Sequence, residues 1–310
     1  ASDVALKPNG RMEGPGVSDN GAGLAALLAV ARALKTAPPL RDCTHNLLLA
    51  ATVGEEGEGN LSGMRYLCKQ SGYARRVAAF LVLDGAGTDH ITTQALGSRR
   101  FEVVLNGPGG HSWSDFGAAN PVHALARAVA TFADAQLPAG ARSSVNVGIL
   151  EGGTSVNAIP AEARAKVDIR SESDAALDQI VSVLEEGVRR AVEEENRRAS
   201  GAAVTFKLRE IGSRPAAGLA ADSRILACVR AVDAHLGIRA RLDCASTDAN
   251  IPLSMGLEAT AIGAGGQGGG AHTPAEWFLP EGRDLGLKRF FLTLLLLLRG
   301  AAPQIPHPDL

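Results

Sequence analysis

The sequence has little of what marks a nucleic-acid-binding or membrane-spanning protein. Its 31 Lys and Arg residues nearly balance its 33 Asp and Glu residues, and the net charge of −2 gives no basic excess that would attract nucleic acid or an anionic membrane. The most apolar run, residues 290–298, is about half of the roughly 20 residues that a membrane-spanning helix needs. We therefore expect a buried helix there, and small molecules as partners.

Cysteine is also scarce. Cys43, Cys68, Cys228 and Cys244 are widely spaced, form no CxxC pair and have no histidine at the spacing of a structural zinc motif. We expect four free thiols. No signal peptide is visible, which predicts a cytoplasmic location, although the sequence starts with Ala rather than Met.

The first hundred residues have the pattern of an α/β domain. Residues 21–35 are rich in Ala and Leu at helical spacing, with Asp19 and Asn20 before them as candidate caps. Residues 46–53 and 78–83 are short apolar runs separated by a helical segment, which is typical of strands in a sheet covered by helices on both faces.

The pattern changes near residue 97 and predicts a separate, inserted α+β unit. Its expected elements are strands over 99–106, 144–150 and 162–170 and helices over 121–135 and 175–198. The first domain is expected to resume with a helix over 223–236, a strand near 259–262 and a helix over 284–299. At 310 residues two domains are the better expectation, and we assign 1–96 with 208–310 to the first and 97–207 to the second.

Acidic residues follow the two predicted strands of the first domain. Glu55 and Glu56 come after the first strand and Asp84 after the second, where open α/β sheets bind ligands. Adjacent carboxylates repel unless a cation lies near, so one is expected to bind a metal and the other to take a proton from metal-bound water. Asp19 and His272 complete a set of ligands that zinc accepts. The alternative is ordinary: a helix cap, a solvated acidic pair and a loop histidine.

The glycine-rich residues 263–270 precede His272 and are expected to form a tight loop at the site. A phosphate-binding loop would open a helix and be followed by Lys-Ser or Lys-Thr, and neither feature is present.

Six short motifs occur in one order along the chain: GPGVSDNG at 14–21, GEEG at 54–57, LDG at 83–85, GGHS at 109–112, NAIP at 157–160 and GGAHT at 269–273. Together they resemble peptidase family M20, which includes tripeptide aminopeptidase, carboxypeptidase G, acetylornithine deacetylase and succinyl-diaminopimelate desuccinylase. The resemblance spans nearly the whole chain. It implies a zinc-exopeptidase-like α/β sheet with helices on both faces and an inserted α+β lid and dimerisation domain.

The resemblance also implies roles for the acidic cluster. Asp19 would bridge two zinc ions, Glu56 and His272 would ligate one of them, Asp84 would ligate the other, and Glu55 would be the general base. Cobalt or manganese are alternatives because the ligand types overlap. The peptide bond after Asp19 is usually cis in this family.

In the inserted domain, His111 resembles the residue that reaches the partner subunit's site in a homodimer and stabilises the oxyanion; a capping or packing histidine is the alternative. Asn157 and Arg170 resemble substrate-binding positions, although Arg170 is also suited to an ordinary surface ion pair. Backbone amides around Gly269 are expected to assist in binding a substrate carboxylate.

The chain departs from the family at one point. Members carry a His-x-Asp motif shortly before the first motif, and here no histidine precedes Asp19. One zinc keeps Asp19, Glu56 and His272, while the other keeps only Asp19 and Asp84. The chain is then either a truncated form of an active enzyme or a metal-poor protein; His45 is expected at the wrong end of its strand to compensate.

Three functions follow from these observations. The leading one is a metal-dependent hydrolase of a small peptide, because residues 109–125 look closest to tripeptide aminopeptidases. The second is a deacylase of N-acyl amino acids. The third, from another class, is a non-catalytic dimeric binding protein with an incomplete metal site.

Overall fold

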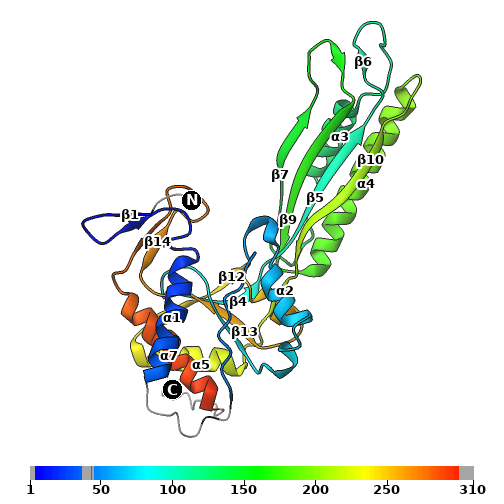
Figure 1. Cartoon of the computed structure of the whole chain (residues 1–310). Coiled ribbons are helices and arrows are strands. Elements are labelled where there is room, and N and C mark those ends of the chain that lie inside the picture. The colour runs from blue at the N-terminus through cyan, green and yellow to red at the C-terminus, as the bar shows by residue number, and fades with distance from the viewer. Residues whose placement is uncertain (1–3, 37–42, 44, 300–310) are drawn as a thin grey trace. The chain divides into compact units, whose positions relative to one another are not determined.

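The computed structural model describes residues 4–36, 43 and 45–299 and divides the chain into two compact units (Figure 1). Unit 1 comprises Ala1–Ala95 and Gly218–Leu310, and unit 2 comprises Leu96–Ala217. The first boundary lies one residue from the predicted one. The second corrects the prediction, since residues 208–217 lie in unit 2. The reason is that β10 (Thr205–Arg214) pairs along its length with β5 (Gly97–Asn106).

Unit 1 is built on a five-stranded sheet that contains both parallel and antiparallel pairings. Its strands run in the order β11 (Ala217–Gly218), β4 (His90–Ala95), β13 (Ala259–Ile262) and β3 (Phe80–Leu83), with β12 (Arg241–Ala245) also paired to β4. β13 pairs in parallel with β3 and β12 with β4, as expected for strands joined by helical crossovers.

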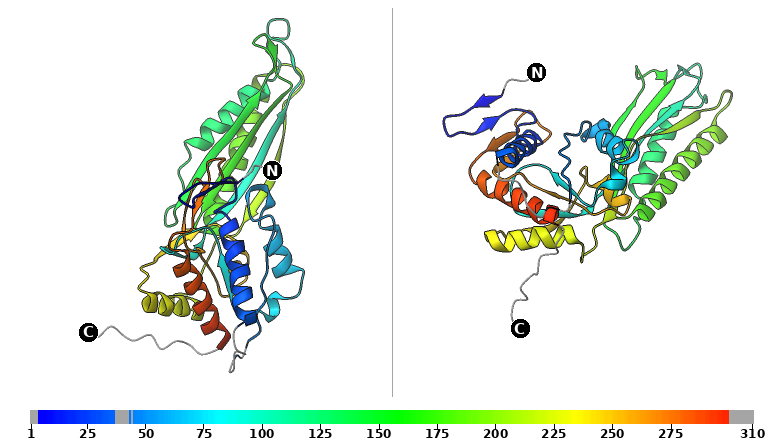
Figure 2. Two further views of the ribbon diagram at one scale, coloured as in Figure 1. Left: turned by 60° about the vertical axis from the view of Figure 1, so that its left-hand side comes forward. Right: turned by 60° about the horizontal axis from the view of Figure 1, so that its bottom comes forward.

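Helices cover both faces of this sheet. On one side α1 (Gly21–Thr36), α5 (Arg224–Leu236) and α7 (Arg283–Arg299) share a buried apolar cluster. Across the sheet lie α2 (Ser62–Lys69) and α6 (Asn250–Ser254), as the two views of Figure 2 show. The apolar run 290–298 is part of α7, which confirms that it forms a helix.

The prediction of a strand over residues 46–53 was wrong, because these residues form no strand. The chain is non-helical there, and no described residue pairs with it as a neighbouring strand. Its leucines are partly exposed, at 37% for Leu47, 47% for Leu48 and 36% for Leu49. An apolar run predicts burial, but a strand also needs a hydrogen-bonded neighbour, and sequence does not supply that partner.

A small antiparallel sheet lies at the start of α1. It consists of β1 (Ala5–Leu6), β2 (Met12–Glu13), β15 (Trp277–Leu279) and β14 (Gln267–Gly269). The glycine-rich segment was expected to be a loop throughout, but its residues 267–269 are a strand because their backbone pairs with residues 277–279. This pairing holds the segments around Asp19 and His272 near each other.

Unit 2 is a four-stranded antiparallel sheet with two helices packed on it. The strand order is β10, β5, β9 (Glu162–Ser171) and β7 (Ser143–Gly152). Its core lies between the sheet and the helices α3 (Pro121–Ala133) and α4 (Asp174–Arg198). Asn120 caps α3 by accepting from the backbone N–H groups of Val122 and His123, and Ser173 caps α4. A short ladder of β6 (Gly110–His111) with β8 (Ala158–Ile159) extends beyond the sheet.

Among the described residues, the four cysteines form no disulfide, as expected. Among the described residues, no helix combines the length and the apolar character that crossing a membrane would require.

Candidate metal centre

Three of the four predicted metal ligands converge in unit 1. Asp19 precedes α1, Glu56 precedes a short 3₁₀ helix, and His272 follows β14. The Nε2 atom of His272 lies 3.1 Å from Asp19 Oδ2 and 3.0 Å from Glu56 Oε1. One ligand atom from each residue can be chosen so that all lie within 4.8 Å of one another. Two carboxylates and an imidazole at these distances are a donor set that fits a divalent cation such as zinc.

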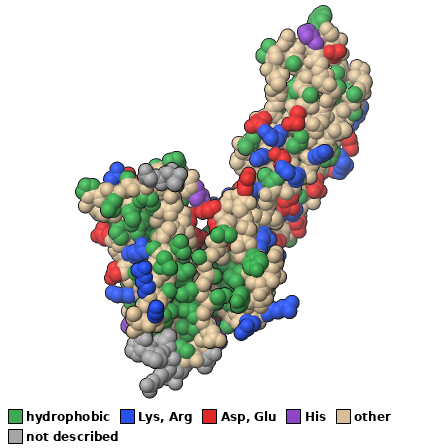
Figure 3. Space-filling view, viewed as in Figure 1, with side chains coloured by type: hydrophobic (Ala, Val, Ile, Leu, Met, Phe, Trp, Pro, Cys, Tyr) green, Lys and Arg blue, Asp and Glu red, His purple; other side chains and the backbone are tan. Residues whose placement is uncertain are grey.

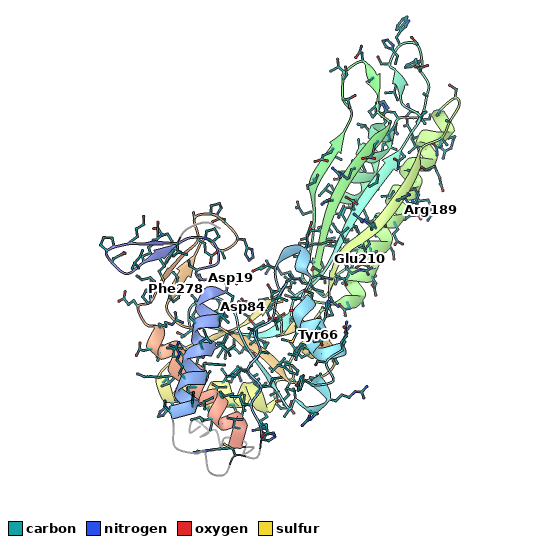
Figure 4. All side chains as sticks on the ribbon, viewed as in Figure 1. Asp19, Tyr66, Asp84, Arg189, Glu210 and Phe278 are labelled. Carbon is teal, nitrogen blue, oxygen red and sulfur yellow. The ribbon has the colours of Figure 1, made fainter. Side chains whose placement is uncertain are left out.

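Asp84, the fourth predicted ligand, lies beside this group. Figure 4 shows Asp84 next to Asp19. It follows β3, and the side chain of Asn20 donates to the backbone oxygen of Leu83 over 2.7 Å, which ties the Asp19 loop to that strand end. The peptide bond between Asp19 and Asn20 is cis, as the family resemblance implied.

The sequence analysis missed Glu276, which fixes the backbone that carries Asp19. Its buried carboxylate accepts from the N–H of Gly16 at 2.7 Å and from those of Ser18 and Asp19 at 2.8 Å each. Burial opposes ionisation, but these backbone donors and the nearby His272 lower the pKa of Glu276. The available signal was an acidic residue four positions after His272.

Gly268 shows why glycine is needed opposite this loop. A Cβ atom at this position would lie 2.1 Å from the Oγ atom of Ser18, the residue before Asp19. Any side chain at residue 268 would therefore require the Ser18 hydroxyl to rotate away, and the Cβ atoms of Ala86 and Ser18, at 3.0 and 3.1 Å, would still leave it little space.

Replacing Glu276 by glutamine is expected to weaken cation binding about 10- to 100-fold, the usual effect of removing a partner that orients metal ligands. The amide NH₂ cannot accept, so a loop N–H loses its acceptor. Competitive titration of zinc against a chelating dye measures the change. Glu281→Gln, at an exposed carboxylate on the same segment, is the matched control and should bind like the unmodified protein. Equal affinity of the two variants would contradict this role.

The site concentrates negative charge. Burial raises the pKa of Asp84 to about 8, and the charges of Asp19, Glu55 and Glu56 add to the shift. Burial and the Asp19 charge likewise raise the pKa of Glu56, and the Glu56 charge raises that of His272. A bound cation would relieve this repulsion, which is the electrostatic behaviour expected of a metal site.

The raised pKa makes a testable prediction about stability. Because Asp84 has a pKa of about 8 when folded and 3.8 ordinarily, the folded state holds a proton that the unfolded chain has lost between these values. The unfolding free energy of the metal-free protein should therefore fall as the pH rises from about 4 to about 8, by at most on the order of 5 kcal/mol. Urea unfolding in chelator across this range measures it. The Asp84→Asn variant should lack this fall of the unfolding free energy with rising pH. The same pH dependence in the variant as in the unmodified protein would contradict the prediction.

Glu55, the predicted general base, precedes Glu56 and lines the same cavity as Asp19 and Asp84. The chain before it is anchored by two contacts. Thr52 Oγ1 donates to the buried carboxylate of Asp248 over 2.5 Å, and the N–H of Gly63 donates to the Val53 oxygen over 2.9 Å.

In unit 2 the structure brings His111 and Asn157 together. The backbone N–H of Ser112 donates to the backbone oxygen of Asn157 over 2.9 Å. The Nδ1 atom of His111 accepts from the N–H groups of Trp113 (3.2 Å) and Ser114 (3.4 Å), which is the capping contact that the alternative interpretation expected. With Nδ1 accepting, a neutral ring carries its proton on Nε2 and can donate it outward.

Arg170 lies apart from His111. In the register of β5 with β9, Arg170 is opposite Ser98 and Glu162 is opposite Asn106, so Arg170 is near the other end of the strand from the β6–β8 ladder. Its Nε atom donates to Asp168 over 2.7 Å, the ion pair that was the alternative. Its substrate role stays a prediction. Gly269 lies in β14, opposite Trp277, three residues before His272.

Comparisons with known proteins agree with this fold. Residues 94–196 match the peptidase dimerisation domain of the M20 type, and residues 5–111 match peptidase family M28. A succinyl-diaminopimelate desuccinylase from Paracoccus denitrificans is 30% identical over 166 residues, which are 51% of this chain and only 43% of that protein.

Solved structures extend the comparison of the fold. Aminopeptidase PepT from Bacillus cereus has a TM-score of 0.72 at 18% identity, covering 95% of this chain and 76% of that one. A tripeptidase from Staphylococcus aureus has a TM-score of 0.73 at 18% identity, covering 97% and 77%. The chain thus has the α/β fold of the zinc-exopeptidase type with an inserted dimerisation domain. The partial matches agree with the resemblance to peptidase family M20 that the ordered motifs carry.

Proposed function

We propose that this protein is a metal-dependent hydrolase of an amide bond in a small peptide. The observation that carries the proposal is the convergence of Asp19, Glu56 and His272 at ligand distances beside Glu55 and Asp84. Asp19, Glu56 and His272 would hold one cation and Asp84, with Asp19, would face a second. Such an ion, when bound, polarises a carbonyl and lowers the pKa of water.

The residues of the chain would carry the proton transfers. Glu55 takes the proton of the attacking water and returns it to the leaving amine, which requires a carboxylate that is not itself a metal ligand. Glu276 holds the loop of Asp19 in place. His111, donating through Nε2, is suited to stabilise the oxyanion.

Dimerisation through unit 2 is part of the proposal. The matching dimerisation domain supports it, as does the edge strand β7, which exposes Ile149 (39%) and Leu150 (56%). An exposed apolar edge can pair with the same strand of a second copy. His111 would then act in the partner's site.

The tripeptidase among the structural relatives favours a tripeptide, whereas the desuccinylase among the sequence relatives favours an N-acyl amino acid. Both substrates present an amide beside a carboxylate. Asn157, Arg170 and the backbone near Gly269 are the groups that we propose bind it. A dimeric binding protein without turnover is the candidate from another class. The observation that favours it is that, among the described residues, the group of close metal ligands is Asp19, Glu56 and His272, with Asp84 outside it.

Two measurements test the proposal. Elemental analysis after dialysis against zinc, cobalt or manganese gives the stoichiometry, and about one ion per chain is expected from the complete ligand set. A panel of tripeptides, compared with acetylornithine and N-succinyl-diaminopimelate, then gives the substrate class. Metal-dependent turnover of any of these supports a hydrolase, while bound metal without turnover by the dimer supports the binding protein. Absence of metal binding would overturn both.

A further inference from the structure

The segment that leads to Glu55 and Glu56 has little burial to hold it in place. Residues 46–53 pair with no strand among the described residues. From residue 45 to residue 54, every residue is exposed except Thr52, which is half-buried. A stretch of chain with so few buried contacts opens locally at little cost in free energy. The positions of the two carboxylates therefore depend on the contacts made where this segment ends.

Thr52 makes the strongest of the contacts that the structure shows there. Its Oγ1 atom donates to Oδ2 of Asp248 over 2.5 Å. Asp248 is only 5% exposed, so this hydrogen bond is shielded from water, and its acceptor is a carboxylate, which forms stronger hydrogen bonds than a neutral group does. Two residues further on, the N–H of Ser62 donates to the Gly54 oxygen over 3.2 Å.

Asp248 is carried by a buried turn between β12 and α6. The N–H of Thr247 donates to Oδ1 of Asn250 over 2.8 Å, and the N–H of Ala249 donates to Oγ1 of Thr247 over 3.1 Å. Thr247, Ala249 and Asn250 are each at most 3% exposed. A buried turn closed by its own hydrogen bonds is a rigid support, so Asp248 offers Thr52 a fixed point of attachment.

Asp248 also lies near the candidate metal centre without belonging to its close ligand group. It lines the same cavity as Glu55 and Asp84. Burial raises the pKa of Asp84, and the charge of Asp248 adds to the shift after the charges of the other nearby carboxylates. Figure 3 shows acidic side chains beside a histidine on the visible face of unit 1.

We propose that Asp248 is a positioning residue of the candidate site, which acts by holding Thr52. Through Thr52 it fixes the backbone that carries Glu55 and Glu56, three and four residues further along the chain. A shift of about 1 Å in a reacting group is enough to lower a catalysed rate by up to about 100-fold. The effect on Glu55 rests on the proposed function, whereas the effect on Glu56 is measured by cation binding, without turnover.

The test compares variants of Thr52 in the full chain. Thr52→Val keeps the branched shape but loses the donor, so zinc affinity, measured by competition with a chelating dye, should fall about tenfold. At saturating zinc, kcat on the best substrate of the panel should also fall about tenfold or more, with KM within about threefold. Thr52→Ser keeps the hydroxyl group and should stay within about threefold of the unmodified protein in each measurement.

Variants of Asp248 show whether the effect depends on this hydrogen bond. Asp248→Asn keeps an oxygen that accepts from Thr52 and should lose less zinc affinity than Asp248→Ala, which has no acceptor. In the Asp248→Ala background, Thr52→Val should lower zinc affinity by less than about a further twofold, because the contact is already absent. Urea unfolding shows which variants are folded. If Asp248→Ala does not fold, the comparison of Thr52→Val with Thr52→Ser decides alone.

Thr36→Val is the matched control for the loss of a threonine hydroxyl. Thr36 ends α1, and its Oγ1 atom donates to the oxygens of Arg32 and Ala33 in the same helix. This variant should change zinc affinity and kcat by less than about twofold.

The positioning role and the proposed function fail in different ways. Unchanged zinc affinity and kcat in Thr52→Val, or an equal loss in Thr52→Ser, would overturn the positioning role and leave the hydrolase proposal standing. A rise in KM with unchanged kcat would also overturn it. Loss of zinc affinity in Thr52→Val, when even the unmodified protein turns over no substrate, would support the positioning role and contradict the hydrolase. Absence of zinc binding by the unmodified protein would overturn both.

Discussion

Replacing Glu55 by glutamine is expected to lower kcat by about 10³-fold, within the range that general acid–base catalysis contributes. Glutamine keeps the shape of the side chain but cannot take a proton from water. The bound metal should stay at the unmodified stoichiometry, because Glu56 rather than Glu55 contributes to the ligand group with Asp19 and His272. Steady-state kinetics on the best substrate of the panel, with elemental analysis of the same sample, measures both effects.

Glu58→Gln is the matched control for this variant. Glu58 is an exposed carboxylate on the 3₁₀ helix Gly57–Gly59, three residues beyond Glu55, and the variant should retain kcat within about twofold. A metal-replete Glu55→Gln protein with unmodified activity would contradict the base assignment. Loss of activity together with loss of metal would instead make Glu55 a ligand.

Replacing Asp233 by alanine is expected to lower the unfolding free energy by about 3–5 kcal/mol, the range found when one partner of a buried ion pair is removed. Arg289 is fully buried, and its Nε and Nη2 atoms donate to Asp233 over 2.6 and 2.7 Å. Its Nη1 atom donates to the backbone oxygen of His90 over 3.2 Å. Without Asp233, α5 and α7 would enclose a guanidinium with no counter-charge.

This expected loss of unfolding free energy comes mainly from the Arg289 charge that stays buried without a partner, and it does not measure how much the ion pair itself stabilises the protein. Burial raises the pKa of Asp233 and Arg289 offsets this only in part, so desolvation cancels much of the attraction. Asp284→Ala removes an exposed pair with Lys288 on the same helix α7, and a change below about 1 kcal/mol is expected. Urea unfolding of the two variants gives the comparison, and similar losses would refute the argument.

Much of the fold was predictable because most elements carry a strong local pattern. The helices α1, α3, α4, α5 and α7 and the strands β3, β5, β7, β9 and β13 lie within a few residues of their predicted bounds. In each case hydrophobic periodicity and turn residues agree with the final structure. β4, β10 and β12 were missed, and their hydrogen-bonded partners are distant in the sequence.

The residues of the candidate site also include some that the sequence predicted and one that it did not. Asp19, Glu56 and His272 were predicted from residue type and motif order, and the structure brings them together. Glu276 was not predicted, because its role comes from three backbone N–H groups about 260 residues away.

The sequence by itself determined most of the local elements, the residue types of the candidate metal site and the family resemblance, because these depend on residue type, spacing and order. Only the tertiary structure decided which backbone groups find partners. It assigned residues 208–217 to unit 2 through the pairing of β10 with β5, and it left residues 46–53 without a strand neighbour. It also raised the pKa of Asp84, first by burying its carboxyl group and then by bringing carboxylates from separate segments near it. Strand pairing, side-chain burial and the repulsion between carboxylates depend on residues that are far apart in the sequence, so a local sequence pattern does not predict them.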